Sequence, residues 1–236
     1  MKNKNKVVVI TGDSKGIGRY LTEYYLKKGF VVAGCSRLES GLNTKSRSYS
    51  HFRLDVSQED QVVKTVRSIF HRFKGIDILI NCAGIASLNH ALLTPAETVD
   101  RIFAVNFKGT FLMSRECSKF MKINRCGRIV NISSVAVPLK IEGEAIYAAS
   151  KSAVATFSEI FAKEVAPFNI TCNCVGPTPI ETDLIKNVPV EKIDRIINSL
   201  SLKRMGKFID VANAIDFFVK DESGYVTGQT IYLGGV

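Results

Sequence analysis

The sequence predicts an α/β protein with a doubly wound, parallel sheet of about seven strands and helices on both of its faces. Two features of the chain lead to this class. Short apolar runs rich in β-branched residues alternate with longer segments of helical period. A glycine-rich turn also follows the first of these runs directly. The 236 residues suit one domain, and we expect residues 1–236 to form it.

The apolar runs read as seven strands of a sheet that is buried on both faces. Strands of this kind are near-continuous apolar runs, because helices cover the sheet from both sides. Helical segments between them provide the crossovers that parallel strands require. The predicted strands are Val7 to Ile10, Phe30 to Cys35, His51 to Val56, Ile76 to Asn81, Arg128 to Ser133, Ile170 to Val175, and Thr230 to Leu233.

Six segments read as helices. The fourth has a stripe that we expect to be buried (Val154, Phe157, Ile160, Phe161 and Val165), and Pro167 ends it. The predicted helices are Ile17 to Lys28, Gln58 to Phe73, Pro95 to Met121, Ala145 to Ala166, a stretch within Glu181 to Leu202, and Asp210 to Val219.

The connection between the second and third strands is unusual. Only residues 36–50 separate these strands, and LESGLNTKSRSYS (38–50) has no amphipathic pattern. We therefore expect the crossover helix to be absent or reduced to a single turn.

Composition limits the classes of partner. The formal net charge of +10 favours an anionic small ligand or an acidic carrier, although a solvated surface can account for much of it. The basic residues are scattered, which argues against nucleic acid. No apolar run approaches the roughly 18 residues of a membrane span or forms a signal-peptide core, so we expect no membrane and a cytoplasmic location. The six cysteines form no CxxC pair and the three histidines have no ligand spacing, which indicates reduced thiols and no metal site.

The turn after the first strand, TGDSKGIG (11–18), opens a helix. Glycines let the backbone turn sharply and approach a pyrophosphate, and a helix N-terminus offers free N–H groups and the positive end of its dipole. Glycine also serves ordinary turns, but this turn joins a strand to a helix at the start of a βαβ chain. We therefore expect a Rossmann-type dinucleotide site. Its first contacts are Gly12, Ser14, Lys15, Gly16, Ile17 and Gly18.

The end of the second strand favours NADP(H). An acidic residue there would accept hydrogen bonds from the ribose 2′-hydroxyl and repel a 2′-phosphate, but GCSR (34–37) has none and the next acid is Glu39. Arg37 can bind a phosphate with its forked donors, Ser36 can donate to it, and Lys15 lies in the neighbouring loop. The alternative is a pair of solvated cations.

The segment EAIYAASK (144–151) places Tyr147 and Lys151 four residues apart, on one face of a helix with small neighbours. A nearby ammonium stabilises a phenolate, so we expect it to lower the pKa of Tyr147 from about 10 toward the working range. Tyr147 is then a proton donor for a carbonyl oxygen that receives hydride. Taken alone, a Tyr-x-x-x-Lys pair is more often structural than catalytic.

Two further polar residues fit the same chemistry. The strand GRIVNISS (127–134) ends in hydroxyls at the carboxyl edge of the sheet, where ligands bind in such folds. Ser134 can hold the substrate oxygen beside Tyr147, whereas its neighbour Ser133 is not expected to. Asn106 lies in an apolar helical segment, where an amide is unfavourable unless it is used, and it can hold a water beside Lys151.

Together these motifs resemble the short-chain dehydrogenase/reductase family along essentially the whole chain. The matching pieces are TGDSKGIG, Asp55, NCAG (81–84), Asn106, Ser134, YAASK (147–151) and NCVGPTPIETD (173–183). The resemblance implies that Asn106, Ser134, Tyr147 and Lys151 form a catalytic tetrad. It also implies that Tyr147 and Lys151 contact the cofactor, together with Asp55, Val56, Asn81, Ala83, Gly84, Pro177, Ile180 and Thr182. Asp55 can equally cap the following helix.

The substrate is less specified. The chain is most similar to 3-oxoacyl-acyl carrier protein reductases, through GRIVNISS and GYVTGQT (224–230), which implies a carrier-linked substrate. Arg125 matches one basic docking position of that group, but Phe168 occupies the other. A reductase of a sugar, polyol or other small ketone remains the alternative, and a non-catalytic NADP-binding regulator is a more remote one. The resemblance also implies a homotetramer or homodimer.

Overall fold

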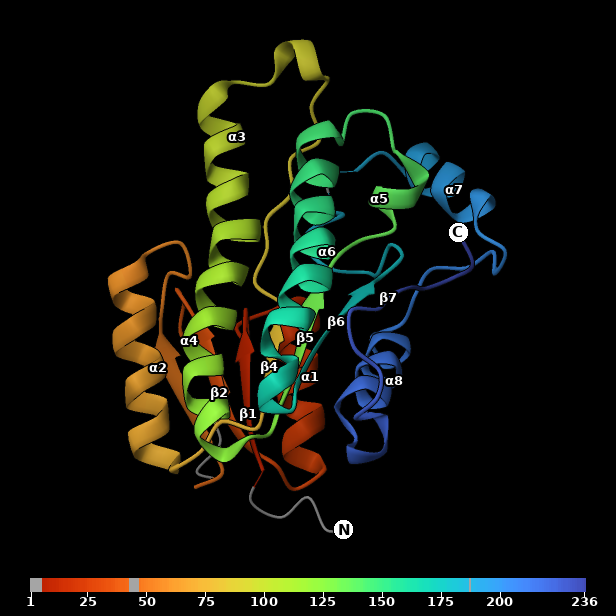
Figure 1. Cartoon of the computed structure of the whole chain (residues 1–236). Helices are drawn as coiled ribbons and strands as arrows, with labels where there is room; N and C mark the ends of the chain where they lie inside the picture. Colours follow the sequence, from red (N-terminus) through yellow and green to blue (C-terminus); the bar gives the residue numbers. More distant parts are fainter. Residues whose placement is uncertain (1–5, 43–46, 187) are drawn as a thin grey trace.

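The computed structural model describes residues 6–42, 47–186 and 188–236. Within these residues seven strands form one parallel sheet in the order β3-β2-β1-β4-β5-β6-β7 (Figure 1). This confirms the predicted doubly wound α/β fold. The strands are β1 Val7–Thr11, β2 Val31–Ser36, β3 Tyr49–Arg53, β4 Ile78–Asn81, β5 Gly127–Ile132, β6 Ile170–Gly176 and β7 Thr230–Tyr232.

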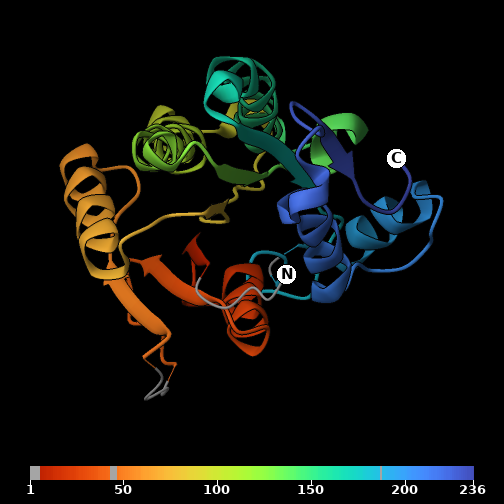
Figure 2. The ribbon, with the colours of Figure 1, turned by 60° about the horizontal axis from the view of Figure 1, so that its bottom comes forward.

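Helices cover both faces of the sheet (Figure 2). Apolar side chains of α2, α4 and α6 form one buried cluster with the sheet, and those of α1 and α8 form a second on the opposite face. None of the helices described spans a membrane, because each is too short or too polar. The α-helices are α1 Gly16–Lys27, α2 Glu59–Phe73, α3 Ala96–Phe103, α4 Gly109–Asn124, α5 Ala136–Leu139, α6 Ala145–Val165, α7 Val190–Ser199 and α8 Phe208–Val219.

The predicted bounds of the third strand are wrong. The sequence suggested residues 51–56, whereas β3 runs from Tyr49 to Arg53. The register explains the shift, since β3 pairs residue by residue with β2 from Val32 to Ser36 and ends where β2 ends. Leu54 and Val56 carry buried apolar side chains outside the sheet, and periodicity alone does not separate the two situations.

The predicted helix over residues 95–121 is interrupted. It consists of α3, a π-helical segment Ala104–Lys108 and α4, which extends to Asn124. A π-helical turn inserts extra backbone without a change in composition, so the sequence pattern does not reveal it.

The stripe predicted on α6 is partly correct. Val154, Phe161 and Val165 are buried, but Ile160 is 54% exposed. At 3.6 residues per turn, Ile160 lies about 120° around the helix from Val154, outside the face that meets the sheet. As predicted, the helix ends before Pro167, which lies in a short 3-10 turn.

The connection between β2 and β3 agrees with the expectation of a missing crossover helix where it is described. Residues 37–42 and 47–48 contain no helix. Residues 43–46 of this stretch lie outside the described residues.

Candidate active site

The predicted catalytic residues gather at the carboxyl edge of the sheet. Ser134 follows the end of β5, and Gly84 follows the end of β4. Tyr147 and Lys151 lie in the first two turns of α6, while Asn106 lies in the π-helical segment. The topology therefore brings together residues that are far apart in the sequence at the edge where open α/β sheets bind ligands.

The π-helical segment holds Asn106 inside the protein, fully buried. Its Oδ1 accepts a hydrogen bond of 2.9 Å from the main-chain N–H of Ile85. Its Nδ2 donates to the Ile85 carbonyl at 2.9 Å and to Ser150 Oγ at 3.0 Å. The amide is thus fixed between the loop after β4 and the helix that carries Tyr147.

Lys151 is buried beside Asn106. Its Nζ donates a hydrogen bond of 2.8 Å to the Ile132 carbonyl at the end of β5. A Cβ at Gly84 would lie 3.3 Å from Lys151 Nζ and 3.4 Å from Asn106 Oδ1, so the glycine leaves room for both groups. Burial lowers the pKa of Lys151 to about 8.

The pKa of Tyr147 is shifted in the opposite direction to the one predicted. Burial raises its pKa to about 12, and nearby Glu144 and Cys82 also raise it. A hydrogen bond with Ser134 acts in the other direction but does not prevail. The Lys151 Nζ lies 5.9 Å from the centre of the phenol ring, and desolvation of the buried phenolate sets the direction of the shift.

The two serines after β5 differ in their surroundings. Ser134 shares a hydrogen bond with the Tyr147 hydroxyl, and its Oγ accepts one of 3.1 Å from the main-chain N–H of Ala136. Ser133 is buried and donates to the Lys151 main-chain carbonyl at 3.2 Å. Of the two, Ser134 is the one beside Tyr147.

The glycine-rich turn has the backbone geometry that a phosphate cradle needs. Gly12 has a φ of +78°, and a Cβ at Gly18 would lie 2.3 Å from the Gly12 carbonyl oxygen. No described side chain caps the N-terminus of α1, and its first turn contains no acidic residue. The first N–H groups of the helix are therefore available to an anion.

Two contacts join this turn to the rest of the site. A Cβ at Gly12 would lie 3.0 Å from Ala83 Cα, so the turn lies against the segment after β4. Gly16 lies on the other side against the Thr182 side chain. Pro177 and Ile180 lie in the segment that joins β6 to Thr182, and both are buried.

Asn81 belongs to the interior of the sheet. Its side chain is 3% exposed, and its Nδ2 donates to Ser114 Oγ at 3.0 Å and to Asn131 Oδ1 at 2.8 Å. The Asn81 side chain is thus held by contacts within the sheet and its neighbouring helix.

The residues predicted for the adenosine side lie around the end of β2. Arg37 is exposed, and Ser36 Oγ donates to the Leu38 carbonyl at 2.8 Å. Lys15 Nζ lies 3.4 Å from Asp183 Oδ2. The Asp55 carboxylate accepts hydrogen bonds from the N–H and hydroxyl of Ser57, and so orders the turn before α2. Val56 is buried against Gly109 of α4.

Sequence reasoning missed the details of two acidic residues. Glu144 has no role in the sequence prediction, but it lies near Tyr147, and burial raises its pKa. Asp13, inside the glycine-rich turn, was given no role although it is fully buried. An acid among glycines in a phosphate-binding turn was the available signal, since a carboxylate there is electrostatically unfavourable.

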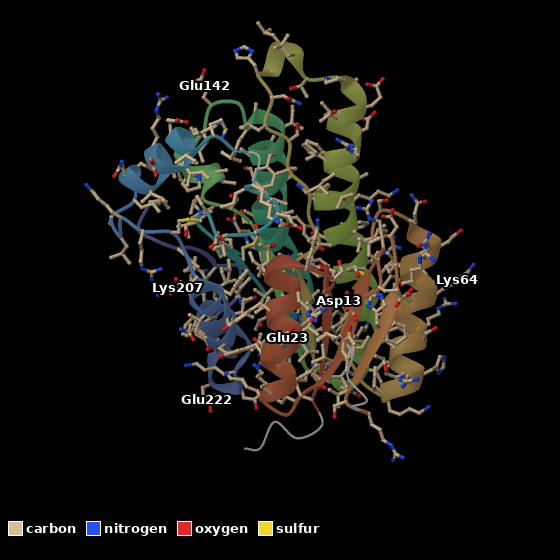
Figure 3. All side chains as sticks on the ribbon, turned by 180° about the vertical axis from the view of Figure 1, so that it is seen from behind. Asp13, Glu23, Lys64, Glu142, Lys207 and Glu222 are labelled. Carbon is tan, nitrogen blue, oxygen red and sulfur yellow. The ribbon has the colours of Figure 1, made fainter. Side chains whose placement is uncertain are left out.

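A cleft of about 480 Å³ lies between α7 and the loop before α6. Glu142, labelled in Figure 3, lies in that loop. The cleft is lined by His90, Leu139, Ile141, Glu142, Gly143, Lys192, Arg195, Ile196 and Ser199.

Across residues 6–42, 47–186 and 188–236, no group of three or more His, Cys, Asp or Glu side chains could hold a metal ion.

Known sequences match the chain over its whole length. A profile described as short chain dehydrogenase matches residues 6–208. The 3-oxoacyl-[acyl-carrier-protein] reductase of Buchnera aphidicola is 34% identical over 239 residues, which cover 100% of this chain and 98% of the relative. The corresponding reductase of Thermotoga maritima is 35% identical over 245 residues, with the same coverage.

Two solved structures also match the chain over nearly its whole length. ElxO with NADP bound superposes with a TM-score of 0.89 and 29% identity, covering 97% of each chain. The ligand-free aldohexose dehydrogenase of Thermoplasma acidophilum has a TM-score of 0.89 and 31% identity, covering 99% of this chain and 94% of that one.

Proposed function

Because the chain belongs to the short chain dehydrogenase family, we propose that it is an NADP(H)-dependent oxidoreductase that reduces a carbonyl group to an alcohol. One observation carries the proposal. Ser134 follows β5, Tyr147 and Lys151 lie in α6 and Asn106 lies in the π-helical segment, yet the four form one connected set at the carboxyl edge of the sheet. The set combines a proton donor, a partner for a carbonyl oxygen and a buried cation.

The residues present fit a dinucleotide. The Gly12–Gly18 approach and the uncapped first turn of α1 suit a pyrophosphate. Arg37, Ser36 and Lys15 suit a 2′-phosphate, and Lys15 would exchange its exposed contact with Asp183 for it. When bound, NADPH supplies the hydride. ElxO, which is similar in fold and sequence, was solved with NADP bound.

In the proposed mechanism the Tyr147 phenol gives its proton to the carbonyl oxygen. The raised pKa keeps this phenol neutral, which is the form a proton donor needs. Ser134 holds the same oxygen. Lys151 is charged at neutral pH, because it titrates only near pH 8, and it helps to return a proton to Tyr147. Asn106 supports this relay by fixing the loop and helix beside Lys151.

For the substrate we favour a 3-oxoacyl thioester, reduced to the 3-hydroxyacyl form. Curated relatives over the full length are 3-oxoacyl-[acyl-carrier-protein] reductases. The net charge of +10 suits an acidic carrier. A cytoplasmic site of action and a place in fatty acid biosynthesis belong to the same proposal.

A small ketone, sugar or polyol is the second candidate. At the docking region Phe168 replaces a base, and its ring lies under Lys122 Nζ at 4.3 Å. Arg125 Nη2 donates to the Pro167 carbonyl at 3.0 Å, which occupies part of its donor set. A similar structure is that of an aldohexose dehydrogenase.

The test is NADPH oxidation, followed by absorbance, with an acetoacetyl thioester beside a panel of small ketones and keto-sugars. A kcat/KM of about 10⁴ M⁻¹s⁻¹ or more on the thioester supports the acyl reductase. Activity confined to the small ketones supports the second candidate. Tight NADPH binding without turnover on any carbonyl would indicate a non-catalytic, NADP-binding regulator instead.

We also propose a homodimer or homotetramer. Ile160 is 54% exposed on α6, three residues after Phe157, whose ring meets those of Phe107 and Phe111, and an apolar face of this kind suits a second copy. Light scattering after size-exclusion chromatography tests the proposal. A monomer at micromolar concentration would contradict it.

A further inference from the structure

Asp13 occupies the middle of the glycine-rich turn, yet its side chain is fully buried. Its Oδ2 accepts a hydrogen bond of 2.7 Å from the Tyr49 hydroxyl and lies 2.9 Å from His51 Nδ1. Both partners belong to β3, the edge strand of the sheet. Asp13 therefore ties the turn after β1 to a strand two positions away. Figure 3 shows it between α1 and the strands at this edge of the sheet.

The sheet leaves a notch for this carboxylate at Gly34. This glycine lies in β2, directly opposite His51 in the strand register. A Cβ at Gly34 would lie 1.9 Å from Asp13 Oδ2, closer than any real contact. Asp13 can cross β2 and reach β3 because β2 has no side chain at that point.

The same cluster holds the connection that carries Arg37. Ser40 lies in that connection, is buried, and hydrogen-bonds the Tyr49 side chain. The Ser40 carbonyl accepts a hydrogen bond from Arg19 of α1. The described residues of this connection contain no helix, so these contacts, in place of a crossover helix, fix its position. They join the glycine-rich turn, the edge strand and the segment after Arg37.

Burial makes the two contacts of Asp13 Oδ2 important. Asp13 Oδ1 and His51 Nε2 are also buried, and within the described part of the chain neither has a hydrogen-bond partner. A buried carboxylate is costly unless it is hydrogen-bonded, so Asp13 depends on Tyr49 and His51. The carboxylate also helps to raise the pKa of Tyr49, which keeps that hydroxyl a donor.

We propose that Asp13 is a positioning residue for the dinucleotide. Through Tyr49 and His51 it fixes the spacing between the glycine-rich turn and the segment that carries Arg37. A pyrophosphate at the first and a 2′-phosphate at the second belong to one ligand, so its affinity depends on both sites being held in register. The inference rests on the proposed binding of NADP(H). Asp13 itself takes no part in the chemistry.

The experiment compares NADPH with 2′-AMP, which reaches only the Arg37 end. Both are titrated by fluorescence or calorimetry against the wild type, Tyr49→Phe and Gly34→Ala. We expect either change to raise the Kd for NADPH about tenfold, while the Kd for 2′-AMP changes by less than about twofold. The KM for NADPH should rise in parallel, and kcat at saturating NADPH should stay within about twofold of the wild type.

A conservative pair separates the hydrogen bond from the charge. Asp13→Asn keeps an oxygen that accepts hydrogen bonds from Tyr49 and His51, so this variant should keep most of the NADPH affinity of the wild type. Asp13→Ala leaves both donors without an acceptor and should lose about tenfold. If the two variants bind NADPH equally, Asp13 is not a positioning residue of this kind.

Tyr25→Phe is the matched control. Tyr25 is also buried, and its hydroxyl donates to a carboxylate, Asp216, at 3.0 Å, but it lies near the far end of α1. This variant should lower the melting temperature and leave the Kd for NADPH unchanged. Equal weakening by Tyr25→Phe, or NADPH affinity within twofold of the wild type in folded Tyr49→Phe, would overturn the inference. If Gly34→Ala does not fold, Tyr49→Phe decides, since it removes one oxygen. Failure of the wild type to bind NADPH would instead refute the proposed function.

Discussion

At the scale of single residues, the proposed chemistry depends on opposite effects of burial on two neighbours. Burial raises the pKa of Tyr147 to about 12 and lowers that of Lys151 to about 8. Each shift disfavours the charged form of the group. At neutral pH the phenol therefore holds its proton and Lys151 still holds its charge. This combination suits proton donation during reduction, whereas the reverse reaction needs the phenolate.

Replacing Tyr147 by Phe removes the proposed proton donor and little else. We expect kcat to fall about 10²- to 10⁴-fold, the range for general acid catalysis, while the Kd for NADPH stays within about threefold. Tyr232→Phe is the control, because Tyr232 hydrogen-bonds Ser133 as Tyr147 hydrogen-bonds Ser134. It should keep nearly full turnover. Substantial activity in Tyr147→Phe would show that another group donates the proton.

The pH dependence follows from Lys151. Its pKa is lowered to about 8, so its charge is present below that pH and is lost as the pH rises through it. We expect kcat/KM for carbonyl reduction to be level near neutral pH and to decline above about pH 8. Lys151→Arg keeps its charge to much higher pH and should remove this decline, even if its overall rate is lower. A wild-type profile that stays level to pH 10 would mean that this charge is not needed.

The choice of cofactor is argued at Arg37, which is exposed at the end of β2. Arg37→Asp places a carboxylate where a 2′-phosphate is proposed to bind. The ratio of kcat/KM for NADPH to that for NADH should fall by about tenfold or more, through repulsion and loss of a charge-assisted pair. Arg53→Asp, an exposed base at the end of β3, is the control. An unchanged ratio in Arg37→Asp would refute the 2′-phosphate assignment.

At the scale of elements, the π-helical segment between α3 and α4 carries the most specific function. It aims Asn106 at the two main-chain groups of Ile85, and it puts the amide beside Lys151. One structural irregularity thus fixes the loop after β4 and the start of α6 at once. π-Bulges are frequent at functional sites.

Asn106→Ala should therefore cost stability as well as turnover. The N–H and carbonyl of Ile85 would lose their partners, which we expect to lower the free energy of unfolding by about 1–3 kcal/mol. Chemical denaturation measures this loss. Asn89→Ala is the control, because among the described residues its exposed amide donates only to Ser87 Oγ in the same loop. Equal stability of the two variants would mean that the bonds of Asn106 to Ile85 contribute little.

The elements also show how far sequence reasoning reaches. Strands can be found because apolar runs persist in a sheet covered on both faces, but the bounds predicted for β3 are too late in the chain because Leu54 and Val56 are also apolar and buried. The break at residues 104–108 was missed because a π turn changes backbone geometry and not composition. The absence of a helix from the described residues between β2 and β3 could be expected, since a stretch without an amphipathic pattern cannot pack a helix.

At the scale of the whole molecule, the place of Ser134 could be anticipated because parallel strands bring their carboxyl ends to one edge, whereas the candidate tetrad as a set rested on the resemblance to the family. The pKa of Tyr147 could not, because burial depends on packing from several elements at once. The partners of Asp13 were also hidden. Tyr49 and His51 follow it by 36 and 38 residues, and only the β2–β3 register turns both toward the glycine-rich turn.

The net charge of +10 leads to a prediction that separates a carrier-linked thioester from a small ketone as the substrate. A basic protein attracts an acidic carrier over a distance that salt screens, with a Debye length of about 10 Å at 0.1 M ionic strength. For an acetoacetyl group on an acidic carrier protein, kcat/KM should fall about tenfold or more between 0.05 and 0.5 M salt, with NADPH kept saturating. The same acyl group on a neutral pantetheine analogue should change by less than about twofold, because it carries no charge to steer. Parallel curves for the two substrates would mean that the charge does not recruit a carrier, and would favour a small ketone as the substrate.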